Sequence, residues 1–423
     1  MAFFFSRDTK VFMSWSYDGT AAKTALYEIP VLDGFSFSQG TNTSEVTLSE
    51  AANSTGGSKR GRAMFTDSFA PAEWSFSTYM RPTVSGTGSA TTATDGVTNG
   101  QHGGNADKFA IEGPLWAAMS ANTYDRATGA SSSDKSDYEP NVFNFANSNQ
   151  VTLGVFDLFF VLGASKDSEG NTYTTGTDGV TVYKLANCSV GSASIDFDIE
   201  GLAQIAWSGN GQSIEEVASL ETRATDSGNS ITGTTTLGIV NEGISSTSNY
   251  IRQKLTDLAI TFDHSASTGT LGALAVDGSN DVTYNVTLTG GNITIENNLT
   301  YLTPETLGSV NVPLGHVMGT RSVSGNFTCY LNDTANSSLD LFERLQESRG
   351  VITNAFDLAF SIGGSGNTPR CVVDIDKAHL ELPSHSFEDV VSVDVSFHGL
   401  STDLSSSTAA NATNEVKLTY TAS

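Results

Sequence analysis

Cysteine is scarce in this 423-residue chain, and the few cysteines lie far apart. They are Cys188, Cys329 and Cys371. An odd number at wide spacing indicates neither a disulfide framework nor a CxxC metal site. We therefore interpret all three as small buried hydrophobic residues.

Basic residues are also few. The chain has 21 Lys and Arg against 46 Asp and Glu, which gives a formal net charge of −25. This balance argues against a protein that grips nucleic acid, because phosphate contacts need Lys and Arg. It fits a channel wall past which DNA slides without sticking, and it fits ordinary surface solubility equally.

Long apolar runs are absent. Residues 1–5 are apolar but are followed at once by charged residues, so they are too short for a signal peptide or a membrane span. We expect no membrane partner. Proline is scarce at nine residues, whereas Gly, Ser, Thr and Asn are abundant. This composition favours β-strands joined by polar turns over a helical protein.

Catalytic motifs are missing as well. The sequence contains no GxSxG elbow, no Walker A loop and no HExxH pair. The glycine cluster at 363–366 precedes Pro369 and is interpreted as a hairpin turn. The acidic loop 167–171 does not match an EF-hand, so a solvated loop is favoured over a weak calcium site. We expect a non-enzymatic protein without cofactor or metal.

Two histidines form the best candidate metal pair. His379 and His385 are separated by an even number of residues, which would place them on one face of a continuous strand. His398 or Asp389 could complete such a site. Pro383 lies between them and is expected to interrupt the strand. We favour a histidine-bearing turn at a subunit contact over a metal site.

A single dense basic cluster is present. Lys59, Arg60 and Arg62 lie in a predicted loop of an otherwise acidic chain. Such a loop could pair with an acidic surface on a neighbouring subunit. A solvated loop without a partner would explain the same residues.

The most informative feature is an internal duplication. Residues 156–163 (FDLFFVLG) recur as 356–363 (FDLAFSIG), with five of eight positions identical. Upstream, 76–80 matches 327–331 in the same order. Collinear matches indicate two copies of one structural unit.

A short helix is predicted between these matches in each copy. Its apolar stripe repeats with the same spacing, as expected for one buried helix face. Ser338 can cap the second helix and Gly350 can end it. The stripe consists of Leu115, Trp116 and Met119 in the first copy and Leu341, Phe342 and Leu345 in the second.

Downstream, 197–209 matches 387–399 without a gap, which pairs Trp207 with Phe397. A weaker match pairs 35–37 with 293–295. Residues 391–397 alternate strictly between apolar and polar side chains, and 193–199 do the same. That pattern predicts strands with one buried face.

These patterns predict a mainly β protein of two tandem domains, 1–240 and 241–423. Each is expected to be a β-sandwich or small barrel with one short flanking helix. The first copy carries long loop insertions. Polar, glycine-rich loops are predicted at 83–104, 126–138 and 164–180, and the linker within 218–249.

A family resemblance rests on the order of several segments. They are 29–39 (IPVLDGFSFSQ), 44–50 (SEVTLSE), 60–62 (RGR), 71–79 (PAEWSFSTY) and 378–389 (AHLELPSHSFED). Their order resembles the major tail tube proteins of tailed bacteriophages. The resemblance spans both halves, over about 25–215 and 250–405.

The resemblance implies a β-sandwich with a flanking helix and a long hairpin that joins neighbouring domains into a continuous inner barrel. Six domains would form a ring, and stacked rings would form the conduit for genome delivery. Two domains per chain imply three chains per ring with pseudo-sixfold symmetry, although a hexamer of whole chains stays open. Implied partners are other tail proteins and DNA that passes without specific binding. The implied location is the virion tail, with synthesis in the host cytoplasm.

Three alternatives stay open at this level. A tail terminator, distal tail or baseplate-hub protein could share the fold. A carbohydrate-binding β-sandwich adhesin would need exposed aromatic pairs, and few candidates are present. A polysaccharide-degrading enzyme would need two carboxylates facing one cleft, which spacing alone does not test.

Overall fold

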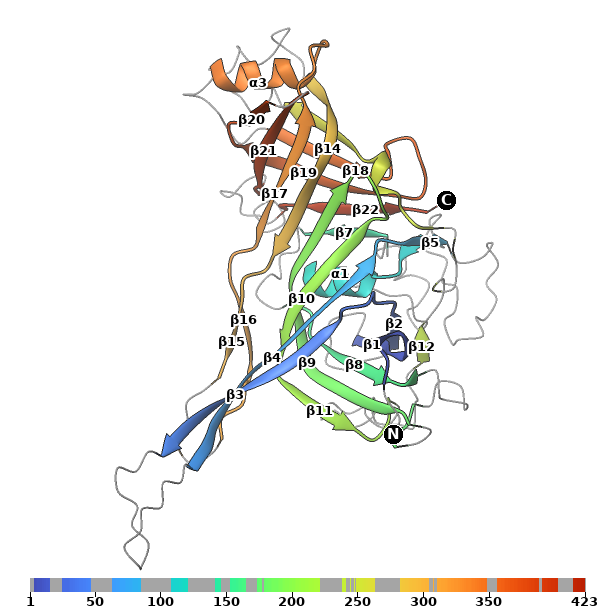
Figure 1. Cartoon of the computed structure of the whole chain (residues 1–423), viewed down its shortest axis with the longest axis vertical. Helices are drawn as coiled ribbons and strands as arrows, with labels where there is room; N and C mark the ends of the chain where they lie inside the picture. Colours follow the sequence, from blue (N-terminus) through green and yellow to red (C-terminus); the bar gives the residue numbers. More distant parts are fainter. Residues whose placement is uncertain are drawn as a thin grey trace, which may run out of the picture.

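A computed structural model describes most of the chain. The described residues are 4–15, 25–46, 63–84, 108–120, 141–145, 153–164, 173–176, 179–220, 238–240, 244, 247, 249–262, 282–303, 307, 310–347, 356–387, 390–401 and 414–422. Within them the protein is built mainly of β-strands, as the composition predicts, with short helices packed beside them (Figure 1).

The elements before residue 241 are η1 (Ser6–Asp8), β1 (Lys10–Trp15), β2 (Ala25–Ile29), β3 (Ser36–Val46), β4 (Ala63–Tyr79), β5 (Pro82–Val84), β6 (Lys108–Ala110), α1 (Gly113–Ser120), β7 (Val142–Asn144), β8 (Phe156–Leu162), β9 (Thr181–Asp198), β10 (Gln204–Gly211), β11 (Ser213–Val217) and β12 (Gly238–Val240). Those after it are η4 (Gln253–Leu255), β13 (Asp257–Phe262), β14 (Val282–Glu296), β15 (Leu299–Leu302), β16 (Gly315–Met318), β17 (Ser322–Tyr330), α3 (Ser338–Glu347), β18 (Phe356–Ile362), β19 (Arg370–Leu380), β20 (Ser384–Phe387), β21 (Val391–Gly399) and β22 (Lys417–Thr421).

In the second half the strands close into a barrel. The antiparallel pairings run from β14 through β13, β18, β19, β21 and β17 and back to β14. The closure is possible because β14 is long: its first part pairs with β13 and its later part with β17. Apolar side chains alternate inward along these strands and fill the interior.

The first half repeats this order. β2 pairs with β1, followed by β8, β9, β10, β4 and β3. Here β2 and β3 together occupy the place of β14. Tyr27 lies opposite Met13, just as Tyr284 lies opposite Ile260, and both tyrosines are buried. The register also shifts directly after the first phenylalanine of β8 and of β18.

The pairing register refines the predicted correspondence at the later strands. Phe76 lies opposite Trp207, and Phe327 lies opposite Val395. Trp207 therefore corresponds to Val395, two residues before the Phe397 that the ungapped match selects. The match fails there because the connection between β9 and β10 differs in length from that between β20 and β21.

Both predicted helices are present. α1 is buried along its whole length, and the apolar stripe of α3 (Leu341, Phe342, Leu345) is buried against the barrel. The predicted cap of α3 is wrong. Ser338 is the first helical residue, and its Oγ donates to the Tyr330 carbonyl and accepts from the Asn332 amide.

The two halves are joined by shared sheet and by buried polar contacts. Part of β9 pairs with β14, and β22 pairs with β7 on one side and β19 on the other. Arg321 is buried at this junction. Its Nε donates to Asn297 Oδ1, and its Nη1 donates to the Phe145 carbonyl and lies 3.2 Å from a carboxylate oxygen of Glu415.

Two hairpins project from the body in the same direction, toward the lower left of Figure 1. One is the outer part of β3 and β4, and the other is β15 with β16. They touch along a parallel bridge between Ser68 and Asn311. No helix among the described residues is long and apolar enough to span a membrane.

Candidate functional site

Eight strands of the 18-stranded sheet form a run of neighbours that passes through both halves (Figure 1). Its order is β3, β4, β10, β9, β14, β17, β21 and β20, with each neighbouring pair antiparallel. Four strands come from each half. The seam between the halves is the pairing of β9 with β14.

One face of this sheet is apolar and belongs to the core. Its side chains pack under the helices and the other strands, and they include the largest buried aromatics. Representative buried residues are Trp74, Phe76, Ile195, Trp207, Ile293, Phe327, Val395 and Phe397.

The opposite face is polar and accessible. Strand alternation places every second residue on it, and nearly all of them are Ser, Thr, Asn, Asp or Glu. The polar members are Ser36, Ser38, Glu73, Ser75, Ser77, Gln204, Ser208, Asn210, Ser192, Ser194, Asp196, Asp198, Asn292, Thr294, Glu296, Ser322, Ser324, Asn326, Thr328, Ser384, Ser386, Ser392, Asp394, Ser396 and His398, and Tyr79, Ala206 and Tyr330 lie on the same face.

The charge of this polar face has one sign. Its carboxylates are Glu73, Asp196, Asp198, Glu296 and Asp394, and none of its described residues is Lys or Arg. Such a surface produces a negative electrostatic potential over its whole extent. It therefore disfavours close binding of phosphate groups.

Side-chain hydrogen bonds tie neighbouring strands together across the polar face. Ser36 and Ser75 hydroxyls lie 2.8 Å apart, and Ser192 and Ser208 hydroxyls lie 2.7 Å apart. At the seam, Asn292 Nδ2 donates to the Ser194 hydroxyl at 2.8 Å and to the Asp196 carboxylate. These contacts satisfy the polar groups locally and leave a smooth hydroxyl-rich wall.

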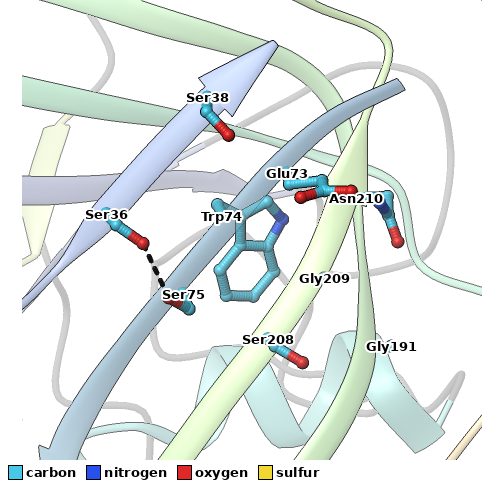
Figure 2. A pocket seen from close by; sticks show the side chains of 9 residues that line it. All are labelled: Ser36, Ser38, Glu73, Trp74, Ser75, Gly191, Ser208, Gly209 and Asn210. Carbon is cyan, nitrogen blue, oxygen red and sulfur yellow. Dashed lines mark hydrogen bonds between the residues drawn. The ribbon is translucent and has the colours of Figure 1, made fainter. Parts of the chain in front are cut away.

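A hollow of about 330 Å³ lies on this face near β3 (Figure 2). It is open to solvent and lined by hydroxyls, one carboxylate and one amide over glycine backbone. None of its lining residues is a histidine, cysteine or lysine that could activate a hydroxyl for catalysis. The lining residues are Ser36, Ser38, Glu73, Trp74, Ser75, Gly191, Ser208, Gly209 and Asn210.

Both ends of the eight-stranded sheet are edges. In the described part of the chain, β3 pairs only with β4 and β20 pairs only with β21. An accessible strand edge carries backbone N–H and C=O groups that can pair with another chain. The two edges come from opposite halves.

The structure separates the two predicted histidines onto different strands. His379 is on β19 and His385 on β20, and the interruption predicted at Pro383 falls between them. His379 lies opposite His398, whose Nε2 is 3.3 Å from a carboxylate oxygen of the exposed Glu381. No group of three or more metal-ligating side chains occurs among the residues described, and Asp389 lies outside them.

The basic cluster Lys59, Arg60 and Arg62 also lies outside the described residues, in the connection between β3 and β4. The hairpin next to it is unusually apolar. Met64 is 62% exposed and Phe65 is 60% exposed. A role for the basic cluster and the two histidines in subunit contacts stays a prediction.

The acidic polar face was not predicted from the sequence. Its signal is the alternation of Ser, Thr and Asp with apolar residues, visible in 391–397. That pattern identifies a half-buried strand but does not say that eight such strands align.

Comparison with known proteins adds independent support. No protein-family profile matches the chain. It is 28% identical over 402 residues to the tail tube protein pb6 of Escherichia phage T5, a match that covers 94% of this chain and 73% of that protein. The match includes both halves, so the whole duplicated architecture is covered. This similarity supports a tail tube protein of a tailed bacteriophage, a structural part of the virion tail.

Proposed function

We propose that three copies of this chain close a ring, and that stacked rings form the tube through which the phage genome passes. The polar face of the eight-stranded sheet would line the lumen. The observation that carries the proposal is the repetition of one four-stranded unit within a chain whose two free sheet edges come from opposite halves. Three chains supply six units and therefore pseudo-sixfold symmetry.

The chemistry of the polar face supports its place at the lumen. It carries carboxylates and hydroxyls but no described Lys or Arg. DNA needs basic side chains to bind, so such a wall would let it slide. The repulsion acts within about 8–10 Å at physiological salt, which is the range that matters in a narrow channel.

The projecting hairpins support stacking. Exposed apolar residues concentrate on them, whereas patches of this kind are rare on monomeric surfaces. Each ring would insert the second hairpin, and the Phe65 face of the first, against the next ring. The exposed residues are Met64 and Phe65 on the first hairpin and Leu302, Val310, Val312, Leu314 and Val317 on or beside the second.

The role we propose is purely structural, without catalysis. The hollow on the polar face is lined by hydroxyls, one amide and the carboxylate of Glu73, with no histidine, cysteine or lysine beside them. The domains are proposed to be 1–240 and 241–423. β12 pairs with β2 of the first unit, and β13 opens the second.

Electron microscopy of the purified protein tests the proposal. The expected result is hollow tubes whose rings average to threefold symmetry with a sixfold appearance. Isolated single rings would instead favour a terminator or distal tail part. Six whole chains per ring would overturn the stoichiometry, and a persistent monomer at high concentration would overturn the conduit itself.

A further inference from the structure

We propose that β20 of one chain pairs with β3 of the next in one defined register, and that the first hairpin docks beside this seam on β19 and β21. The inference rests on the proposed ring. It names the surface, the partner (a second copy of this chain) and the residues that face each other.

The template is the seam inside the chain. β9 and β14 pair antiparallel with Ile195 opposite Ile293. Both isoleucines are buried on the core face. On the polar face, Asp196 lies opposite Asn292. A chain that already joins two units in this way contains the geometry for joining the next.

Equivalent positions follow from the registers inside each half. Phe156 lies opposite Cys188, and Phe356 lies opposite Ala378. A residue of β9 therefore corresponds to the residue 190 positions later in β19 or β20 (378 − 188 = 190). On the other edge, Phe37 lies opposite Trp74, which lies opposite Gly209. In the second half, Ile293 lies opposite Gly325, which lies opposite Phe397. A residue of β14 therefore corresponds to the residue 256 positions earlier in β3 (293 − 37 = 256).

Applying both shifts to the internal seam gives the seam between chains. Ile195 becomes His385, and Ile293 becomes Phe37. His385 of one chain thus lies opposite Phe37 of the next. Ser384 then lies opposite Ser38, and Ser386 opposite Ser36. All four serines are exposed on the polar face, so the seam continues the hydroxyl-rich lining.

A second internal contact sits beside the first. Tyr301 of β15 donates its hydroxyl to the carbonyls of Asn187 at 2.9 Å and Asn210 at 3.0 Å. Its cross-strand neighbour His316 lies 3.1 Å from the Ser189 hydroxyl through Nδ1. The second hairpin is therefore anchored on the bulged end of β9 and on β10.

The same shifts place the first hairpin on the next chain. Counting back 256 residues takes Tyr301 to Glu45. Because β3 has two register shifts against β4 before this position, the outer hairpin is placed as two segments, 44–46 and 63–65, and not residue by residue. Asn187 and Ser189 map onto Lys377 and His379 by the shift of 190. Asn210, which lies opposite Ser189, corresponds to His398, which lies opposite His379. The facing parts are thus 44–46 and 63–65 on one chain, which include Glu45 and Met64, and Lys377, His379 and His398 on the other.

Charge and exposure agree with this docking. The carboxylate of Glu45 would meet the ammonium group of Lys377, which is a complementary pair. His379 and His398 lie beside it, and the carboxylate of Glu381 is 3.3 Å from His398. Met64 would be covered, although it is 62% exposed in the single chain. Neither agreement was used to derive the register.

Paired cysteines test the register in assembled tubes. Ser36→Cys combined with Ser386→Cys should form a disulfide on oxidation, because directly opposite residues in antiparallel strands bring their Cβ atoms within reach. The covalent ladder on a denaturing gel should end at three chains. The native cysteines are buried and would not compete. Ser36→Cys with Ser384→Cys, displaced by two residues, is the matched control and should cross-link weakly.

Tubes that form but cross-link only through the displaced pair, or through neither pair, would overturn the register and leave the tube intact. Absence of tubes from the wild-type chain would overturn the proposed function instead. The pair Ser38→Cys with Ser384→Cys repeats the test should the first double variant fail to assemble.

A charge swap tests the hairpin contact separately. Glu45→Lys should raise the concentration needed for assembly by about tenfold, a factor well within the range of like-charge contacts at interfaces. Adding Lys377→Glu should restore assembly toward the wild-type concentration. Equal defects in the single and double variants would overturn the docking.

Discussion

The ring of Phe197 in the first half lies directly against Gly291 in the second. A Cβ added at Gly291 would be 2.6 Å from that ring and 2.5 Å from the Asn326 carbonyl oxygen. The residue pairs with Phe197 across the seam that joins the halves. Close approach of an aromatic ring and a backbone carbonyl therefore explains why this strand position is glycine.

Gly291→Val should destabilise the folded chain by about 1–3 kcal/mol, because the added atoms have no space. Urea denaturation of the purified chain measures the change. Gly290→Val is the control, since a Cβ there meets only the Phe197 carbonyl oxygen at 3.4 Å, an ordinary contact. Equal losses at both positions would argue against a steric cause at the seam.

Glu112 predicts a pH effect on stability. Its carboxylate is buried, with both oxygens 3.3 Å from the Arg81 amide. Burial raises its pKa to about 7 from an ordinary value of 4.5. The folded state then keeps a proton that the unfolded state has lost, so this stabilisation is complete below pH 4.5 and is lost as the pH rises to about 7.

Glu112→Gln removes this titration. Relative to wild type, the variant should gain about 1–3 kcal/mol in unfolding free energy between pH 4.5 and pH 8. Denaturation of both proteins at each pH gives the difference. If the difference in unfolding free energy between wild type and variant stays constant across this pH range, the pKa of Glu112 is not raised.

Lys184 and Asp157 form an ion pair at 3.0 Å, and both side chains are at least nine-tenths buried. Asp157 also accepts a hydrogen bond from the Asn187 amide at 2.9 Å. Lys184→Met should cost about 3–5 kcal/mol because it leaves an uncompensated buried carboxylate. Adding Asp157→Leu should recover part of that loss. Additive losses in the double variant, measured by thermal or urea unfolding, would mean that the two charges do not interact.

Reversing charge on the polar face should change how DNA interacts with the tube. Glu73→Lys would place an ammonium group in the proposed lumen, repeated once per chain. We expect variant tubes to retain DNA at low salt and to release it as salt increases, because phosphate contacts follow counterion release.

Retention of labelled DNA by sedimented tubes provides the measurement. Asp333→Lys makes the same charge change at an exposed residue off the polar face and serves as the control. Similar retention by both variants would mean that the polar face does not line the channel.

Two sequence signals predicted strands correctly, the internal repeat and the alternation of a half-buried strand. β8 and β18 begin and end at equivalent positions of the repeat and share the sequence FDLxF. Strict alternation identified β21. The paired registers of Phe76 and Phe327 agree with the match made from sequence. Alternation identified β21 because it is a local signal that a strand carries by itself, whereas β8, buried at nearly every position, was found from its repeat in β18.

What sequence could not supply is long-range pairing. The match of Trp207 to Phe397 was displaced by two residues because turns of unequal length separate the strands. The pairing of β9 with β14 leaves no local signature, since it depends on how the two halves meet. The acidic wall follows from that pairing and was equally hidden.

In the proposed ring of three chains, the pairing of β9 with β14 also changes the order of events during assembly. Half of the joints in a six-unit ring are completed when each chain folds, at the high effective concentration that a covalent linker provides. Only three encounters between chains then remain, where six separate units would need six. Tube nucleation should accordingly depend less steeply on chain concentration than it would for a single-unit relative.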